Sequence, residues 1–172
     1  GCSAALTHAP MACVTGGNPD LHVRLPDLRG FARDECIIPK HSRNVYDAAV
    51  RAVGVRVVEV ATAEELEAAF GPRTALVYIL ASPEADSGPL STKALCEAAK
   101  KRGVPVLVDA AAEILTVPNV HLQAGAVRPA VLCGHHQEGV ELGVARALPE
   151  RNLGDVGVGG QSPDQLGPLG LV

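Results

Sequence analysis

Aromatic side chains are scarce in this 172-residue chain, where they make up 2% of the residues and tryptophan is absent. A hydrophobic core must therefore come from the alanine, valine, leucine and isoleucine that dominate the 47% of apolar residues. Such side chains suit parallel strands that are buried on both faces beneath closely packed helices. The length is sufficient for one domain with a core of this kind.

Long apolar runs and clusters of basic residues are also missing. No run approaches the roughly 20 apolar residues that a membrane span needs, and no charged segment followed by an apolar stretch marks a signal peptide. The net charge is −4 with both signs interspersed, so nucleic acid is not an expected partner. We therefore predict a cytoplasmic protein. Because the chain opens at Gly1 within what reads as a helix entry, we also expect it to be a fragment.

Cysteine spacing disfavours a disulfide framework or a zinc site, because the five cysteines are widely separated and no C-x-x-C motif occurs. Reduced thiols are the expectation. His135 and His136 lie close to Cys133, but adjacent histidines point in different directions on a strand and no fourth ligand spacing is present. No metal site is predicted. The cysteines are Cys2, Cys13, Cys36, Cys96 and Cys133.

Helical and strand patterns alternate along most of the chain. Thr62 followed by Glu65 is a capping box, Ser42 is a candidate cap for a helix ending at Gly54, and Tyr46 is expected in the core side of that helix. Alternating elements with short links predict an α/β fold with a doubly wound, mostly parallel sheet. The expected helices span 4–14, 42–53, 62–70 and 91–102, and the expected strands span 36–39, 55–60, 74–80 and 104–109.

Two features could bind a ligand. Asp109 follows an apolar strand, and ligands of doubly wound sheets gather at the carboxyl ends of strands. A carboxylate there either caps the following segment or pairs with a ligand cation. Gly1, Cys2 and Ser3 open a helix whose free N–H groups suit a phosphate, although most helix starts bind only water. Together the two features match the pyridinium and phosphate ends of pyridoxal 5′-phosphate (PLP).

Four segments of the sequence carry a family resemblance: GCSAALTHA from Gly1, TGGNP from Thr15, SRNVYD from Ser42 and VLVDAAAE from Val106. In these segments the chain resembles the selenocysteine synthase-like (seryl-tRNA selenium transferase-related) fold-type I PLP enzymes, and within them the D-glucosaminate-6-phosphate ammonia-lyase branch. The resemblance implies that residues 1–126 are part of the PLP-binding large domain. Residues 127–172, rich in glycine and proline, are expected to form an irregular or disordered tail.

The resemblance implies a role for individual residues. The turn of Gly1, Cys2 and Ser3 would hold the PLP phosphate, and Asp109 would keep the pyridinium nitrogen protonated. Ala111 would pack against the ring. His41 and Arg43 could meet the ring or a substrate anion, or could belong to a solvated loop.

The Schiff-base lysine of the family is not found, since no lysine follows Lys101. Lys93, Lys100 and Lys101 are expected on a helix that faces away from the site, and Lys40 follows the wrong strand for the family role. The family implies β-elimination on an amino acid or amino sugar acid by a homodimer or larger homo-oligomer. Catalytic residues are therefore not assigned, and this chain is either part of such an enzyme, a non-catalytic remnant, or a generic doubly wound binding module.

Overall fold

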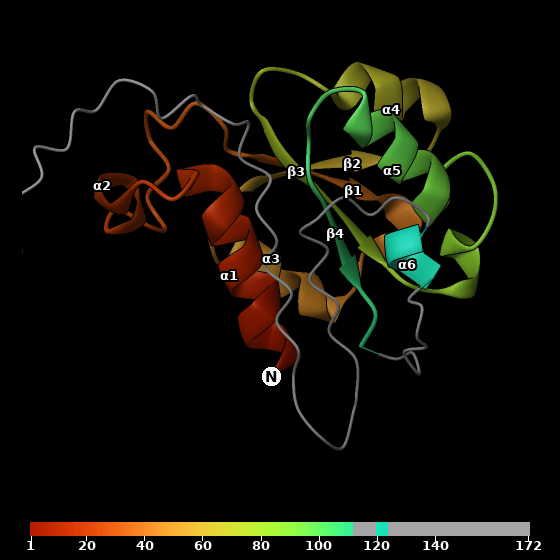
Figure 1. Ribbon diagram of the computed structural model, residues 1–172, viewed down its shortest axis with the longest axis horizontal. Helices are drawn as coiled ribbons and strands as arrows, with labels where there is room; N and C mark the ends of the chain where they lie inside the picture. The colour runs from red at the N-terminus through yellow and green to blue at the C-terminus, as the bar shows by residue number, and fades with distance from the viewer. Residues whose placement is uncertain (112–119, 124–172) are drawn as a thin grey trace, which may run out of the picture.

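A computed structural model of the chain describes residues 1–111 and 120–123, which form a four-stranded sheet with helices on both faces (Figure 1). All strands are parallel, and their order is β2-β1-β3-β4. The predicted α/β class is confirmed, whereas the predicted tail at 127–172 lies outside the described residues. The strands are β1 (Glu35–Pro39), β2 (Arg56–Val60), β3 (Thr74–Leu80) and β4 (Val106–Asp109).

The helices are short apart from the first. They are α1 (Cys2–Thr15), α2 (Pro19–His22), α3 (Ala48–Arg51), α4 (Ala63–Ala69), α5 (Thr92–Lys100) and α6 (Val120–Gln123). Three 3₁₀ turns accompany them: η1 (Lys40–Ser42), η2 (Val45–Asp47) and η3 (Pro83–Ala85). Side-chain caps at Thr62 and Ser91 open α4 and α5 as the sequence predicts.

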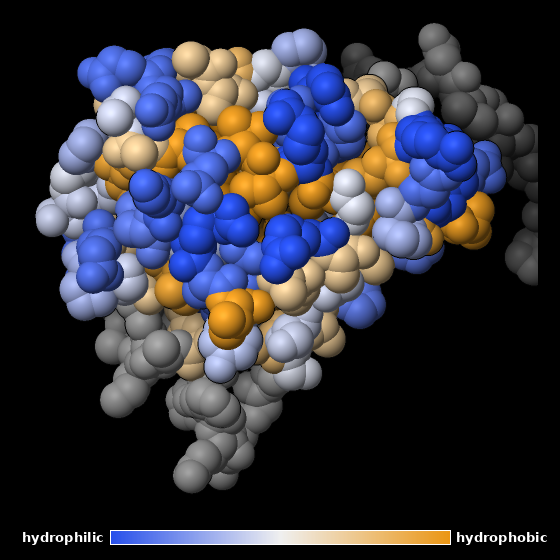
Figure 2. Space-filling model, turned by 180° about the vertical axis from the view of Figure 1, so that it is seen from behind, coloured by the Kyte–Doolittle hydropathy of each residue, from blue (hydrophilic) through white to orange (hydrophobic). Residues whose placement is uncertain are grey.

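Alternation along the strands divides the core into two clusters, one on each face of the sheet. Ile37, Val77 and Val108 pack beneath α4 and α5, whereas Ile38 and Tyr78 pack beneath α1 and α3. Successive side chains of a strand point to opposite faces, so Asp109 follows Leu107 onto the face that α1 and α3 cover. Seen from behind, hydrophobic residues gather at the centre of the surface with hydrophilic residues around them (Figure 2).

Helix α1 continues through Pro10, which is buried. Proline lacks the N–H that would bond one turn back, yet packing in the core cluster compensates for this loss. Two α1 residues, Ala5 and Leu6, are 3% and 2% exposed, and the Thr7 hydroxyl donates to the carbonyl of Ala49 in α3 at 3.2 Å. The helix is therefore fixed on the sheet by tertiary contacts.

The segment after β1 differs from the predicted single helix. It forms η1, η2 and then the short helix α3. Ser42 does not cap a helix; instead the Asn44 side chain accepts the Tyr46 N–H at 2.7 Å. Val45 and Tyr46 are 79% and 66% exposed, so the prediction that Tyr46 lies in the core is wrong.

Gly54 ends this segment at φ +95°, and a Cβ there would approach the Pro26 carbonyl oxygen to 2.2 Å. The close approach of the 19–34 connection requires glycine at this position.

Candidate functional site

The carboxyl ends of the four strands share one edge of the sheet. The arrow of β4 points toward the end of the molecule where the N-terminus of α1 also lies (Figure 1). The connection after β1 crosses the face with α3, and the connection after β3 crosses the opposite face with α5. Neighbouring connections therefore diverge at the carboxyl edge, which is where doubly wound sheets bind ligands.

Asp109 is a deeply buried charged residue at this edge, at 2% exposure. Its Oδ2 accepts the Tyr78 hydroxyl at 3.1 Å, and its Oδ1 accepts the Ala111 N–H at 3.2 Å. No ion pair from any described cation reaches the carboxylate. A buried carboxylate with two neutral donors and no cation is suited to pair with a cationic ligand.

The N-terminus of α1 faces the same edge and the same side of the sheet as Asp109. Gly1 is the N-cap and gives no side-chain cap, so the positive end of the helix dipole is not offset by a capping side chain. No acidic side chain occupies the first turn, and Ser3 is exposed. The positive end of a 14-residue helix is therefore available to an anion.

Three of the four cysteines that the structure describes follow the sequence prediction. Cys13, Cys36 and Cys96 are free, and burial raises the pKa of Cys96 to about 11, so this thiol stays protonated. Cys2 is disulfide-bonded, and its partner lies outside the described residues. The expectation of reduced thiols is therefore wrong for Cys2.

Three buried polar atoms at the carboxyl edge have no hydrogen-bond partner among the described residues. They are His41 Nε2, Ser42 Oγ and Ser82 Oγ, and η1 contacts η3 directly. Burial lowers the pKa of His41, although the negative charge of Glu84 opposes that shift. Buried polar groups normally find partners, so this cluster indicates that a polar ligand or ordered water belongs here.

Arg43 is held away from Asp109 by two carboxylates. Its Nε lies 2.6 Å from Asp47 and its Nη1 lies 2.9 Å from Glu59. Asp47, which is 1% exposed, also binds Arg51 at 2.8 Å. Burial alone would raise the pKa of Asp47, but hydrogen bonds from Arg51 and Arg43 outweigh it and lower that pKa. The structure therefore gives Arg43 a role in fixing the loop after β1.

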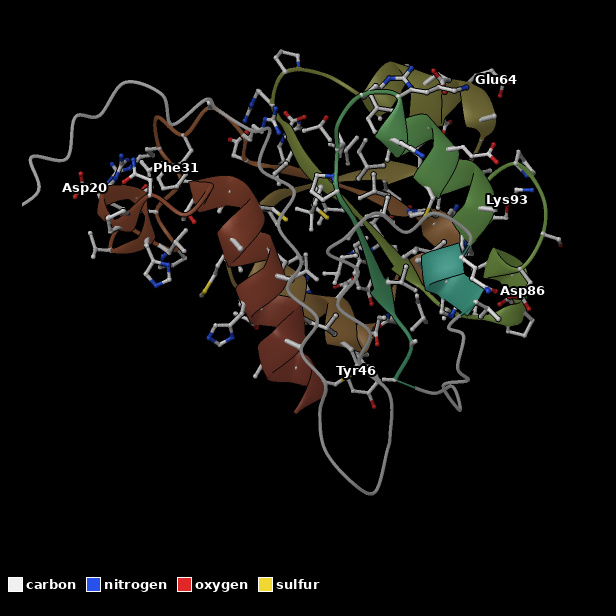
Figure 3. The ribbon with its side chains drawn as sticks, in the orientation of Figure 1. Asp20, Phe31, Tyr46, Glu64, Asp86 and Lys93 are labelled. Carbon is white, nitrogen blue, oxygen red and sulfur yellow. The ribbon has the colours of Figure 1, made fainter. Side chains whose placement is uncertain are left out.

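Lysines lie apart from Asp109. Lys93 and Lys100 are exposed on α5, which covers the opposite face, and Lys93 lies across the molecule from α1 (Figure 3). Lys40, with His41, Ala61 and Leu90, lines a hollow of about 340 Å³ at the carboxyl ends of β1 and β2. Asp109 and α1 do not line that hollow.

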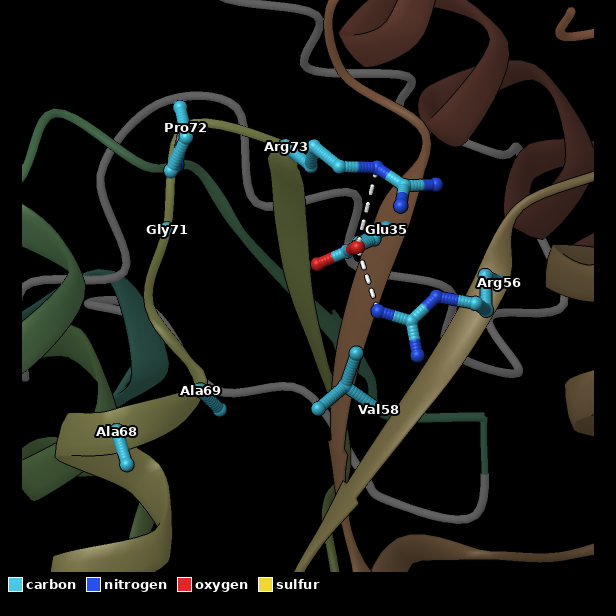
Figure 4. A pocket seen from close by; sticks show the side chains of 8 residues that line it. All are labelled: Glu35, Arg56, Val58, Ala68, Ala69, Gly71, Pro72 and Arg73. Carbon is cyan, nitrogen blue, oxygen red and sulfur yellow. Dashed lines mark hydrogen bonds and ion pairs between the residues drawn. The ribbon is translucent and has the colours of Figure 1, made fainter.

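A second hollow of about 330 Å³ lies at the amino ends of the strands (Figure 4). Glu35 Oε1 lies there between Arg56 at 2.5 Å and Arg73 at 3.2 Å. Arg73 also binds both oxygens of Asp34, at 2.8 and 2.5 Å. Two arginines and two carboxylates balance in charge at this edge, so these ion pairs hold the starts of neighbouring strands together.

The structure thus brings together some site residues that the sequence predicts and adds others. Asp109, Ala111 and the start of α1 share one face, while Arg43 is engaged elsewhere. Sequence reasoning missed Tyr78, because within an apolar strand it reads as core. The register of β3 and β4 would have identified Tyr78, because Tyr78 pairs with Leu107, which lies two residues before Asp109 and on the same face of the sheet. Asn44, Ser42 and Ser82 were also missed as members of the site.

Two absences apply to the part of the chain that the structure describes. No group of three or more histidine, cysteine, aspartate or glutamate side chains could hold a metal ion. No helix there is long and apolar enough to cross a membrane.

Comparisons with known proteins place this geometry in context. No family model matches the chain. D-glucosaminate-6-phosphate ammonia lyase of Salmonella typhimurium is 32% identical over 120 residues, which cover 64% of this chain and 32% of that protein. A solved structure of D-glucosaminate-6-phosphate ammonia-lyase superposes with a TM-score of 0.64 and 30% identity, over 73% of this chain and 36% of its own. Over about a third of the length of these relatives, this chain is therefore similar in sequence and in α/β fold to D-glucosaminate-6-phosphate ammonia-lyase.

Proposed function

We propose that residues 1–126 form the cofactor-binding part of a PLP-dependent lyase that acts on an amino acid or amino sugar acid. The observation that carries the proposal is Asp109, a buried carboxylate that no cation of the described residues reaches and that lies on the same face and at the same edge as the start of α1. The Asp109 carboxylate would accept the pyridinium N–H, and the N–H groups of Cys2 and Ser3 would bind the phosphate.

The residues present fit this cofactor. The unpartnered hydroxyls of Ser42 and Ser82 offer donors and acceptors for polar substituents of a ring, whereas His41 lines the hollow that Lys40 also lines. The methyl side chain of Ala111, half-buried beside Asp109, leaves room for a flat group. Electrostatic complementarity is also present, since the helix start suits an anion and Asp109 suits a cation.

Asp109 and Arg43 would have different roles once PLP is bound. Bound PLP supplies an electron sink, which stabilises negative charge at a substrate α-carbon and so permits β-elimination. Asp109 holds a proton at the ring nitrogen, because a carboxylate within hydrogen-bond reach favours the charged form of its partner. Arg43 could bind a substrate anion only in competition with Asp47 and Glu59.

A non-catalytic role is the second candidate, and the position of the lysines favours it. The exposed lysines of α5 lie on the face opposite Asp109, and Lys40 lines a different hollow. We therefore propose that this chain binds PLP without a covalent bond and is inactive alone. The complete protein would be a cytoplasmic homo-oligomer.

Equilibrium dialysis of the purified chain against PLP tests the proposal. Wild type should retain PLP, Asp109→Ala should bind at least about tenfold more weakly because the ion pair is lost, and Asp86→Ala at an exposed position should match wild type. Equal binding by all three proteins would refute the site. Treatment of the complex with borohydride should leave no lysine adduct in the mass spectrum, whereas an adduct would contradict non-covalent binding.

A further inference from the structure

Tyr78 is completely buried in β3, next to the strand that carries Asp109. Its hydroxyl donates to Asp109 Oδ2 at 3.1 Å and lies 3.2 Å from Asn44 Nδ2. Asn44 belongs to the loop after β1, on the other side of β3 in the sheet order. Three elements far apart in sequence are thus joined by one chain of hydrogen bonds.

The direction of this chain is fixed at Asn44. Asn44 Oδ1 accepts the Tyr46 N–H at 2.7 Å, so its Nδ2 must be the atom that faces Tyr78. That Nδ2 donates to the Ser42 carbonyl at 2.8 Å and to the Tyr78 hydroxyl oxygen at 3.2 Å. An amide nitrogen only donates. The Tyr78 oxygen therefore accepts from Asn44, and its single proton is directed to Asp109.

We propose that Tyr78, oriented by Asn44, is a positioning residue that holds the Asp109 carboxylate in the geometry needed for the cofactor ring nitrogen. This inference rests on the proposed function and names residues that the family resemblance did not supply. The Ala111 N–H holds the second oxygen of Asp109 at 3.2 Å. Each carboxylate oxygen thus has one fixed donor, which defines the plane of the carboxylate and leaves lone pairs for a ligand.

The electrostatics keep Tyr78 in its donor form. Burial raises the pKa of the Tyr78 phenol, and the negative charge of Asp109 raises it further, while the Asn44 hydrogen bond opposes both. The phenol therefore keeps its proton at neutral pH. Without the hydroxyl, Asp109 would retain a single backbone bond and its carboxylate would rotate more freely.

PLP affinity of Tyr78→Phe tests this role, with the full chain used throughout. The substitution removes one oxygen and keeps the buried ring. We expect the dissociation constant for PLP to rise about tenfold, the effect of losing one hydrogen bond to a charged group. Tyr46→Phe is the matched control, because Tyr46 is the other tyrosine of the chain and is 66% exposed; its affinity should equal that of wild type. Equal PLP affinity of Tyr78→Phe and wild type overturns the proposal.

A proton NMR spectrum of the cofactor-free chain tests the hydrogen bond between Tyr78 and Asp109 directly. The chemical shift of the hydroxyl proton would not respond to Asp109 if Tyr78 served only to fill the core. A buried hydroxyl that donates to a carboxylate should give a downfield signal in slow exchange with water, absent in Tyr78→Phe and shifted upfield in Asp109→Asn. A signal that Asp109→Asn leaves unchanged overturns the relay. If the signal responds but wild type does not bind PLP, the cofactor proposal fails and the orientation of Asp109 by Tyr78 stands.

Discussion

The two ends of the parallel sheet treat buried polar groups in opposite ways. At the amino end, Glu35 is buried between Arg56 and Arg73, and Arg73 also holds Asp34. At the carboxyl end, Asp109 is buried without a cation from the described residues, and three polar atoms nearby lack partners. Carboxylates that are paired with arginines need no ligand. Buried polar groups without partners lower the stability of the folded chain unless a ligand binds them. The difference indicates that the carboxyl end is organised for binding.

Asp47 is an exception that clarifies the comparison. It lies in the loop after β1, near the binding end, yet it is paired with two arginines. These ion pairs fix the loop that carries His41, Ser42 and Asn44. Structural charge at the binding end therefore supports the residues that remain available to a ligand.

Replacement of Asp47 should give the largest effect on stability. Asp47→Asn leaves two arginines without their carboxylate, and we expect a loss of about 3 kcal/mol at neutral pH in denaturant unfolding. The pKa of Asp47 is lowered in the folded chain, so its stabilising effect is present above the unfolded pKa of about 3.9 and lost as pH falls through the folded pKa. Wild type and variant should therefore converge in acid, and a constant difference would contradict this assignment.

Removal of Arg73 should cost less and should leave the binding end intact. Arg73→Ala deprives Asp34 and Glu35 of a charged donor, and because the arginine is 54% exposed we expect a loss of about 1.5 kcal/mol. Arg33→Ala, at an exposed position without an ion pair to described residues, should change stability by less than about 0.5 kcal/mol. PLP affinity should not change in either variant. Weaker PLP binding by Arg73→Ala would contradict the proposal that the ion pairs at the amino end act independently of ligand binding at the carboxyl end.

A pair of buried serines should give the smallest effects and opposite signs. Ser91 caps α5 by accepting the Ala94 N–H at 3.3 Å, so Ser91→Ala should lose about 1 kcal/mol. The Ser42 hydroxyl is buried without a partner, so Ser42→Ala should gain up to about 1 kcal/mol while PLP binding weakens. Thermal unfolding and dialysis measure the two quantities. Destabilisation by Ser42→Ala would show that ordered water already satisfies the hydroxyl.

Local signals in the sequence were sufficient to predict the sheet. The predicted strands at 74–80 and 104–109 correspond to β3 and β4, and Thr62 predicted the start of α4, as the structure confirms. These features depend on neighbours within a few residues. The position of Asp109 at a strand end followed from the same periodicity, and this is why the central residue of the candidate site could be predicted.

Long-range contacts account for what was missed. The segment after β1 has a helical pattern, but Asn44 bonds to Tyr78 in β3 and Arg43 pairs with Glu59 in β2, and these contacts favour 3₁₀ turns over one continuous helix. Tyr46 is displaced to the surface as a result. The roles of Asn44 and Tyr78 depend on partners 34 and 31 residues away, which no local pattern contains.

The pairing of Leu80 with Asp109 and of Tyr78 with Leu107 has a consequence for how the chain acquires its site. A slip of one residue between β3 and β4 would turn Tyr78 and Asp109 toward opposite faces. Partly folded states whose strands still exchange partners therefore lack the acceptor altogether, and PLP added during refolding would be taken up only after these strands had locked in place. The time course of PLP binding would then report a late step of folding, even in a chain that catalyses no reaction.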